Sequence, residues 1–146
     1  MAKARHVVAA SLDAINTHDE ERLRSCYADD VLFEAPGDVR LEGGDAVVEY
    51  AMSWLRAFPD ARIDVITEVA NGDWVAQRFV FEGTHEGTLV GPTGEIPATN
   101  RRFSAIGAEF VRVQDGRITE EYLSFDQAEV LTQLGVMPEL AGSARA

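Results

Sequence analysis

The leading candidate for chemistry is Asp126, which stands where the last predicted strand ends and a short helix begins. Glu120, Tyr122 and Ser124 precede it at alternate positions, so one face of this strand is polar where a core strand would carry Val or Ile. If that face is concave, Asp126 lies at the floor or mouth of a pocket. Partial desolvation raises the pKa of an aspartate and suits it to proton transfer near neutral pH. Asp126 is therefore a predicted general acid/base.

A second interpretation of Asp126 is structural. Aspartate is a favoured helix N-cap, and Glu129 lies three residues later, which is the spacing of a capping box. The two roles are compatible, and both stay open. An exposed Asp126 that only caps its helix would favour a ligand-binding protein without catalysis.

His85 is the second catalytic candidate and stands in the segment FEGTHEG, residues 81–87. Histidine titrates near neutral pH and could orient a ligand carbonyl or tune an acid. Glycine in a strand often marks a bulge or a close backbone approach, so the strand geometry at Gly83 determines which face of the sheet His85 occupies. A hydrogen-bonded structural histidine is the alternative. With a regular phase, His85 shares a strand face with Gln77, Phe79 and Phe81.

Arg78 is an isolated charge in an otherwise apolar strand. It either pairs with a carboxylate in the pocket or points to solvent at the rim of the sheet. Other side chains are expected to contact a bound ligand, although aromatic residues at helical spacing are more often core: Tyr122, Trp54, Phe58, Phe79 and Glu34.

Composition narrows the class of protein. The chain has 146 residues, 46% of them apolar, which predicts one domain over 1–146 with a flexible tail from about 140. The net charge of −12 argues against nucleic acid or an anionic membrane surface as partner. No apolar run reaches the ~18–20 residues that span a bilayer, so we expect a cytoplasmic protein.

No cofactor or metal is predicted. Cys26 is the only cysteine, which excludes an internal disulfide and a cysteine-based metal site. The three histidines have no ligand spacing, and the chain has no HExxH, GxGxxG, Walker or GxSxG motif.

The first half of the chain predicts helices. Val8, Leu12 and Ile15 recur at helical spacing, and Thr17 with Glu20 forms a capping box for a second helix. After a short strand over 31–35, a third helix is expected from an N-cap at Asp45 to Pro59.

The second half predicts a sheet with tight turns at Asn71-Gly72 and Asp115-Gly116, the first of type I′, and a loop over 91–100. A final helix over 126–134 ends at Gly135. Helices followed by a long antiparallel meander indicate an α+β fold with a curved sheet and a concave pocket. The strands are expected over 63–69, 74–88, 103–114 and 118–125.

Three segments carry a family resemblance: GTHEG (83–87), QDGRI (114–118) and EYLSFDQAEVLTQLGVMP (121–138). They resemble the SnoaL-like polyketide cyclases, or ester cyclases, of the nuclear transport factor 2-like superfamily. The resemblance implies a cone-shaped curved antiparallel sheet packed against N-terminal helices, the cystatin-like α+β barrel. It also implies a homodimer formed through the open sheet face.

The resemblance also implies a cofactor-free intramolecular aldol ring closure on a hydrophobic polyketide ester. Asp126 matches the family's general acid/base, and His85 matches a histidine that lines the pocket and contacts the substrate. The sequence departs from the family pattern at two places, one in the pocket wall and one in the loop at its rim. Tyr122 stands where many relatives have Trp, and residues 98–101 read Ala-Thr-Asn-Arg where many have Pro-Thr-Gly-Arg.

Two alternatives remain open at this point. One is epoxide hydrolysis of the limonene-epoxide hydrolase type, with Arg78 beside Asp126 and a second carboxylate from Glu34 or Glu120. The other is a non-catalytic small-molecule-binding or accessory protein in a biosynthetic pathway; some near relatives in antibiotic clusters support hydroxylation instead.

Overall fold

The computed structural model describes residues 2–91 and 94–137; the predicted tail from about 140 lies outside them. None of the described helices is long and apolar enough to cross a membrane. The elements in chain order are α1 (Ala2–Asn16), α2 (Glu20–Ser25), β1 (Tyr27–Ala35), β2 (Val39–Glu42), α3 (Gly44–Ala57), β3 (Arg62–Asn71), β4 (Trp74–Thr84), β5 (Leu89–Gly91), β6 (Gly94–Ile96), β7 (Arg102–Gln114), β8 (Arg117–Phe125) and α4 (Gln127–Gln133).

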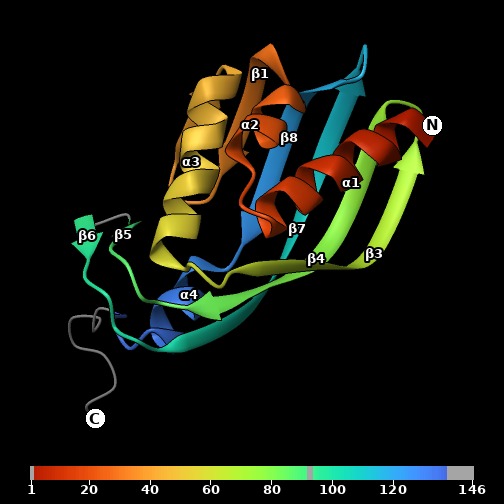
Figure 1. Ribbon diagram of the computed structural model, residues 1–146. Helices are drawn as coiled ribbons and strands as arrows, with labels where there is room; N and C mark the ends of the chain where they lie inside the picture. The colour runs from red at the N-terminus through yellow and green to blue at the C-terminus, as the bar shows by residue number, and fades with distance from the viewer. Residues whose placement is uncertain (1, 92–93, 138–146) are drawn as a thin grey trace.

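Six of these strands form one curved sheet in the order β2-β1-β8-β7-β4-β3. Helices α1 and α3 lie on one face of it, and α4 packs beside β7 (Figure 1). This confirms the predicted α+β class with helices on one face. One expectation needs correction: β1 runs parallel to β8, so the sheet is mixed and not wholly antiparallel. Among the described strands, β2 and β3 form its two open edges.

Strand β7 alternates regularly between the two faces of the sheet. Its odd-numbered residues from Phe103 to Val113 are buried toward the helices, and its even-numbered residues, apart from half-buried Arg112, are exposed. Strand β8 does not keep one phase, because its register with β7 shifts between the pairs Arg112–Glu120 and Val113–Ile118. Thr119 is the extra residue of this bulge, and an extra residue turns the following side chains to the opposite faces.

The predicted helix caps are partly right. Asp126 caps α4 by accepting a hydrogen bond from the Glu129 amide at 3.1 Å, and Gly135 has the positive φ (76°) predicted for the residue after that helix. The cap of α2, in contrast, is Asp19, which accepts from the Arg22 amide, whereas the Thr17 hydroxyl bonds back to Asp13 within α1.

The start of α3 also differs from the prediction. Its N-cap is Gly43, and Asp45 lies in the first turn, where it forms an ion pair with Arg24 at 2.7 Å. An acidic side chain in a first turn is favoured by the helix dipole, and capping by a side chain is a separate effect.

The type I′ geometry predicted for Asn71-Gly72 occurs instead at the second predicted turn, Asp115-Gly116. Asp115 and Gly116 both have positive φ (52° and 76°), as a type I′ turn requires. In the other hairpin Asn71 pairs directly with Trp74, so the loop is Gly72-Asp73 and only Gly72 has positive φ. Strands β2, β5 and β6 were not predicted, and β4 ends four residues earlier than expected.

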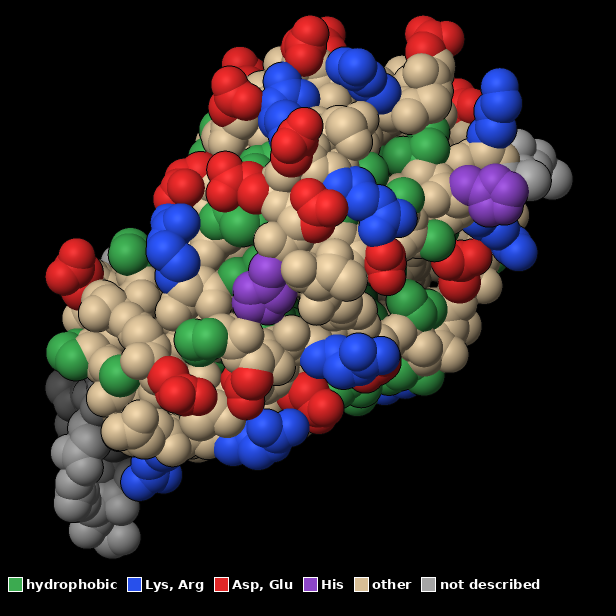
Figure 2. All heavy atoms as spheres, viewed as in Figure 1, with side chains coloured by type: hydrophobic (Ala, Val, Ile, Leu, Met, Phe, Trp, Pro, Cys, Tyr) green, Lys and Arg blue, Asp and Glu red, His purple; other side chains and the backbone are tan. Residues whose placement is uncertain are grey.

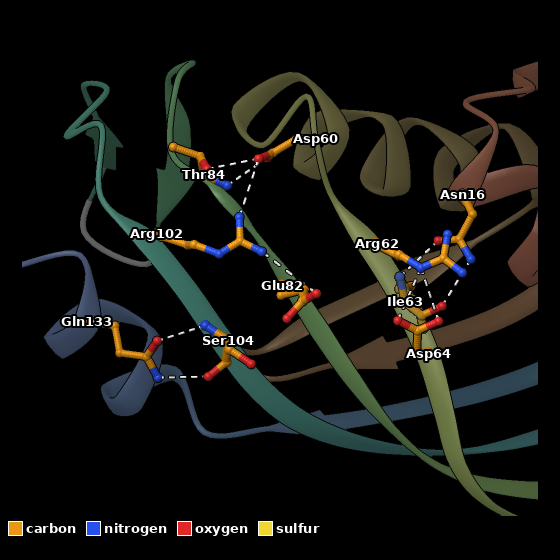
Figure 3. Close-up of polar contacts among 10 residues, drawn as sticks. All are labelled: Asn16, Asp60, Arg62, Ile63, Asp64, Glu82, Thr84, Arg102, Ser104 and Gln133. Carbon is orange, nitrogen blue, oxygen red and sulfur yellow. Dashed lines mark hydrogen bonds and ion pairs between the residues drawn. The ribbon is translucent and has the colours of Figure 1, made fainter.

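Two side-chain amides fasten helix ends to strands (Figure 3). Asn16, the last residue of α1, donates to the Ile63 carbonyl at 2.9 Å and accepts from the Ile63 amide at 2.8 Å. Gln133 of α4 pairs in the same two-bond manner with the Ser104 backbone of β7. Both helices border the same interior space, so these bonds hold its walls in place.

Candidate active site

A cavity lies between α1, α3, α4 and the concave face of the sheet, with a volume of about 940 Å³ including its open mouth. Its wall is mainly aliphatic and aromatic, as is usual for sites that bind small molecules. The lining residues are Ser11, Leu12, Ile15, Tyr27, Tyr50, Ala51, Trp54, Leu55, Ile63, Phe79, Phe81, Phe103, Ala105, Ile106, Gly107, Glu109, Val111, Glu121, Leu123, Phe125 and Val130.

Two carboxyl groups stand in this apolar wall. Glu109 of β7 is 6% exposed and Glu121 of β8 is 9% exposed. The register pairs Glu109 with Leu123 and Val111 with Glu121, so the two glutamates are diagonal neighbours on one face of adjacent strands. Side chains at such diagonal positions are within reach of each other.

Tyr27 of β1 completes this polar cluster. Its hydroxyl donates to Glu121 Oε1 at 3.0 Å, across 94 residues of sequence. Burial, together with the charge of Glu121, raises the pKa of Tyr27 well above its usual value, so the hydroxyl stays protonated and remains a donor.

Burial also perturbs both carboxyl groups. It raises the pKa of Glu109 well above the ordinary glutamate value, and the neighbouring charge and hydrogen bond of Glu121 add to this effect. Burial raises the pKa of Glu121 too, but hydrogen bonds from Glu109 and Tyr27 oppose that rise. A protonated acid beside a carboxylate is what general acid–base catalysis at neutral pH requires.

Other polar groups near the cavity are engaged elsewhere or are neutral. The Ser11 hydroxyl donates to the Val8 carbonyl at 2.7 Å. Gln77 is buried directly opposite Glu109 in the pairing of β4 with β7. Among the described lining residues none is basic, so nothing in the wall offsets a negative charge on the glutamates.

Asp126 is not among the residues that line the cavity. Its side chain is exposed and caps α4. The prediction that the row of Glu120, Tyr122 and Ser124 faces the pocket is wrong, because the bulge at Thr119 turns Glu121, Leu123 and Phe125 inward instead. The acid/base role of Asp126 stays a prediction.

The outer face of the sheet carries several residues that were expected to contact a ligand. Tyr122 stacks on Trp74 and donates to Glu120 at 2.6 Å. Glu34 pairs with Tyr122 in the register of β1 and β8 and forms an ion pair with Arg40. Arg78 is exposed on β4 between the inward positions of that strand, and it does not line the cavity.

His85 continues the inward phase of β4, since the pairing with β7 stays regular through Gly83. A Cβ at Gly83 would lie 3.1 Å from Phe58 Cβ and 3.3 Å from Ala61 Cα, so this glycine permits a close approach of the chain. Of the two predicted explanations for a strand glycine, close approach holds.

The His85 side chain is fully buried, with its ring centroid 5.3 Å from that of Phe58. Its Nδ1 accepts a hydrogen bond from the Thr99 amide at 3.2 Å, which fixes the segment before β7. Burial lowers the pKa of His85, so the ring is neutral at pH 7. The structure thus shows His85 buried and hydrogen-bonded through Nδ1, and its predicted contact with the substrate stays a prediction.

The aromatic residues divide into wall and core. Trp54 and Phe79 line the cavity, whereas Phe58 lies behind the wall, fully buried between Trp54, Phe81 and Phe103. Sequence reasoning missed Glu109, Glu121 and Tyr27. A signal was available for Glu109: it occupies a core position in the alternating segment FSAIGAEFVRV, where every other inward residue is apolar or glycine.

Comparison with known proteins identifies the family. The family model for SnoaL-like polyketide cyclases matches residues 5–134, nearly the whole chain. The protein belongs to this family, as the segments singled out in its sequence predicted.

Curated relatives are cyclases of Streptomyces. The chain is 37% identical over 87 residues to aklanonic acid methyl ester cyclase DnrD of Streptomyces peucetius, covering 58% of this chain and 57% of that protein. It is 29% identical over 126 residues to nogalonic acid methyl ester cyclase of Streptomyces nogalater, covering 85% and 91%. The match thus spans little more than half of the first of these relatives.

Solved structures agree with the fold. IdmH from Streptomyces antibioticus superposes with a TM-score of 0.77 at 30% identity, over 91% of this chain and 99% of that one. AclR from Streptomyces galilaeus gives a TM-score of 0.80 at 26% identity, over 96% and 85%. An epoxide hydrolase of Mycobacterium tuberculosis, at 20% identity and a TM-score of 0.71, shares the fold alone.

Proposed function

We propose that this protein is a cofactor-free cyclase that closes a ring in a hydrophobic polyketide ester by an intramolecular aldol-type reaction. The observation that carries the proposal is the pair of buried carboxyl groups, Glu109 and Glu121, in the wall of an aromatic cavity. Membership of the SnoaL-like family and the cyclase activity named for its relatives support the same reaction class.

The cavity suits a neutral, apolar substrate. Its wall of aliphatic and aromatic side chains would hold a polyketide chain by burial of apolar surface and exclude water from the reacting atoms. A folded conformation would bring the two reacting carbons together, which is the main requirement of an intramolecular reaction. The carboxyl pair would supply the proton transfer.

The experiment uses the esters named for the relatives, the methyl esters of aklanonic acid and nogalonic acid. An aldol closure changes no atoms, so the product has the mass of the substrate but a different retention time and absorption spectrum. We expect conversion by the native protein, little conversion by Glu121→Gln, and near-native conversion by Asp126→Asn. Loss of turnover in Asp126→Asn alone would instead assign the acid/base role to Asp126.

A ligand-binding protein without turnover is the second candidate, and the exposed position of Asp126 favours it. Binding of either ester, measured by calorimetry, without any conversion would establish this role. Epoxide hydrolysis loses its basis, because Arg78 is exposed and lies outside the cavity.

We also propose that a second copy of the chain covers the outer face of the sheet. The register aligns Val69, Ala76, Phe110 and Tyr122 across four strands, and the Phe110 side chain is 59% exposed. An exposed apolar row of this kind is typical of an interaction surface. Light scattering should give a dimer for the native protein and a monomer for Phe110→Glu; a native monomer would contradict the proposal.

A further inference from the structure

We propose that Glu109 and Glu121 share a single proton, which Glu109 holds while Glu121 carries the charge, and that Tyr27 is the positioning residue that sets this order. The use of the pair in ring closure rests on the proposed function. The location of the proton does not, since it is a property of the protein without substrate.

The pair cannot carry two charges at neutral pH. The two carboxyl groups are buried diagonal neighbours on adjacent strands, so they interact directly at short range. Neither takes part in an ion pair among the described residues, and the side chains around the cavity are otherwise neutral. Two adjacent carboxylates in such a site repel each other and lack solvation, so one remains protonated at neutral pH.

The surroundings of the two carboxyl groups differ. Glu121 accepts a hydrogen bond from the Tyr27 hydroxyl at 3.0 Å, and a hydrogen bond donated to a carboxylate favours its charged form. Glu109 has no corresponding hydroxyl donor among the described residues, and Gln77 opposite it is neutral. The proton therefore stays on Glu109.

The remaining groups that face the pair do not disturb this order. Tyr50 of α3 lines the same cavity, and burial raises its pKa, so it is neutral. Cys26 precedes Tyr27, and burial raises the pKa of its thiol as well. Helix α1 adds no charged side chain to the described wall. The pair thus carries one negative charge, and the hydrogen bond from Tyr27 keeps that charge on Glu121.

This order defines complementary roles in an aldol closure. Glu121 accepts a proton from a carbon that is acidified by neighbouring carbonyls, as that C–H bond breaks. The resulting enolate carbon forms the new C–C bond with a ketone carbon. Glu109 gives its proton to the former ketone oxygen, which becomes a hydroxyl. Transfer of one proton from Glu121 to Glu109 restores the starting state, so atoms and charges balance.

Infrared spectroscopy of the substrate-free protein at pH 7 tests the assignment, because a protonated carboxyl has a C=O stretch separate from that of a carboxylate. We expect this band in the native protein and in Asp126→Asn, the exposed-carboxyl control. Glu109→Gln should remove it, whereas Glu121→Gln should keep it, since burial still holds the proton on Glu109.

Absence of the band in the native protein, or its loss in Glu121→Gln with retention in Glu109→Gln, would overturn the proposal. Tyr27→Phe should raise by about one pH unit the midpoint of the acid-side titration, in which Glu121 takes up its own proton and the band grows, because the charged form loses one hydrogen bond. A merely structural tyrosine would leave that midpoint unchanged. If the band behaves as expected but no ester is converted, the proposed function fails and the shared proton stands.

Discussion

Glu120 and Glu121 are neighbours in the chain, but they lie on opposite faces of β8 and have opposite electrostatics. On the outer face, Glu120 accepts hydrogen bonds from Tyr122 and from Arg112 at 3.0 Å, and these lower its pKa. On the inner face, Glu121 has no described basic partner, and burial raises its pKa. The environment on each side of the strand, and not the residue type, therefore decides which carboxyl is suited to proton transfer.

The same contrast holds for the two faces of the whole sheet. The outer face of the sheet carries ion pairs and the stacked rings of Tyr122 and Trp74. On the helix-covered surface of the molecule, acidic and basic side chains are interspersed (Figure 2). The concave side carries an aromatic wall with one acidic cluster. Chemistry is therefore expected on the inside, and stability or assembly effects on the outside.

The largest difference is expected when one charge is removed from each face of β8. Glu121→Gln should lower kcat by about 100-fold or more, the usual contribution of a general acid–base group, whereas Glu120→Gln should stay within a few-fold of native. Steady-state kinetics on a converted ester gives both values. Equal losses in the two variants would mean that the inner position has no special role.

The second contrast concerns packing. Phe58→Ala removes a fully buried ring from the core behind the cavity and should cost about 3–5 kcal/mol of unfolding free energy. Phe110→Ala on the outer face should change the stability of the isolated chain by about 0.5 kcal/mol or less. Urea unfolding at low protein concentration measures both, and a large effect of Phe110→Ala there would show that the ring packs within one chain.

The two buried titratable sites should respond to pH in opposite directions. Glu109 has a raised pKa, so between the unfolded value of 4.5 and its folded value the native state binds the extra proton, and stability is lost as pH rises. His85 has a lowered pKa, so below its unfolded value of 6.5 the unfolded state binds the extra proton, and stability is lost as pH falls.

Thermal unfolding across this pH range checks both signs. Glu109→Gln should flatten the loss of stability on the alkaline side, and His85→Gln should flatten the loss on the acidic side. Each slope is at most about 1.4 kcal/mol per pH unit for a single group. If a variant leaves the pH dependence of stability unchanged on its side of the range, a group other than the one replaced causes that dependence.

The smallest effect is expected at the helix cap. Asp126→Ala should lower stability by about 1 kcal/mol, because the Glu129 amide loses its acceptor, while Asp126→Asn should cost little. Chemical denaturation of the two variants makes the comparison. An equal loss in both would mean that the charge, and not the cap, matters at this position.

Much of the fold could be predicted because the relevant signals are local. The Asp115-Gly116 turn, the cap at Asp126 and the end of the last helix at Gly135 each depend on residues a few positions apart. The acid at position 109 was also detectable, as a charge in a strict alternation. The family followed from continuous segments of sequence.

Local sequence patterns were sufficient for the class of fold, the family, and the turn and helix cap on either side of β8. Only the tertiary structure decided which face of that strand lines the cavity, because one extra residue at Thr119 reverses the alternation and its pairing with Arg112 and Val113 is not a local property. The contact of Tyr27 with Glu121 likewise requires β1 to run parallel to β8. Asp126 was placed correctly as a cap, and the buried carboxyl pair could be assembled only by the folded chain.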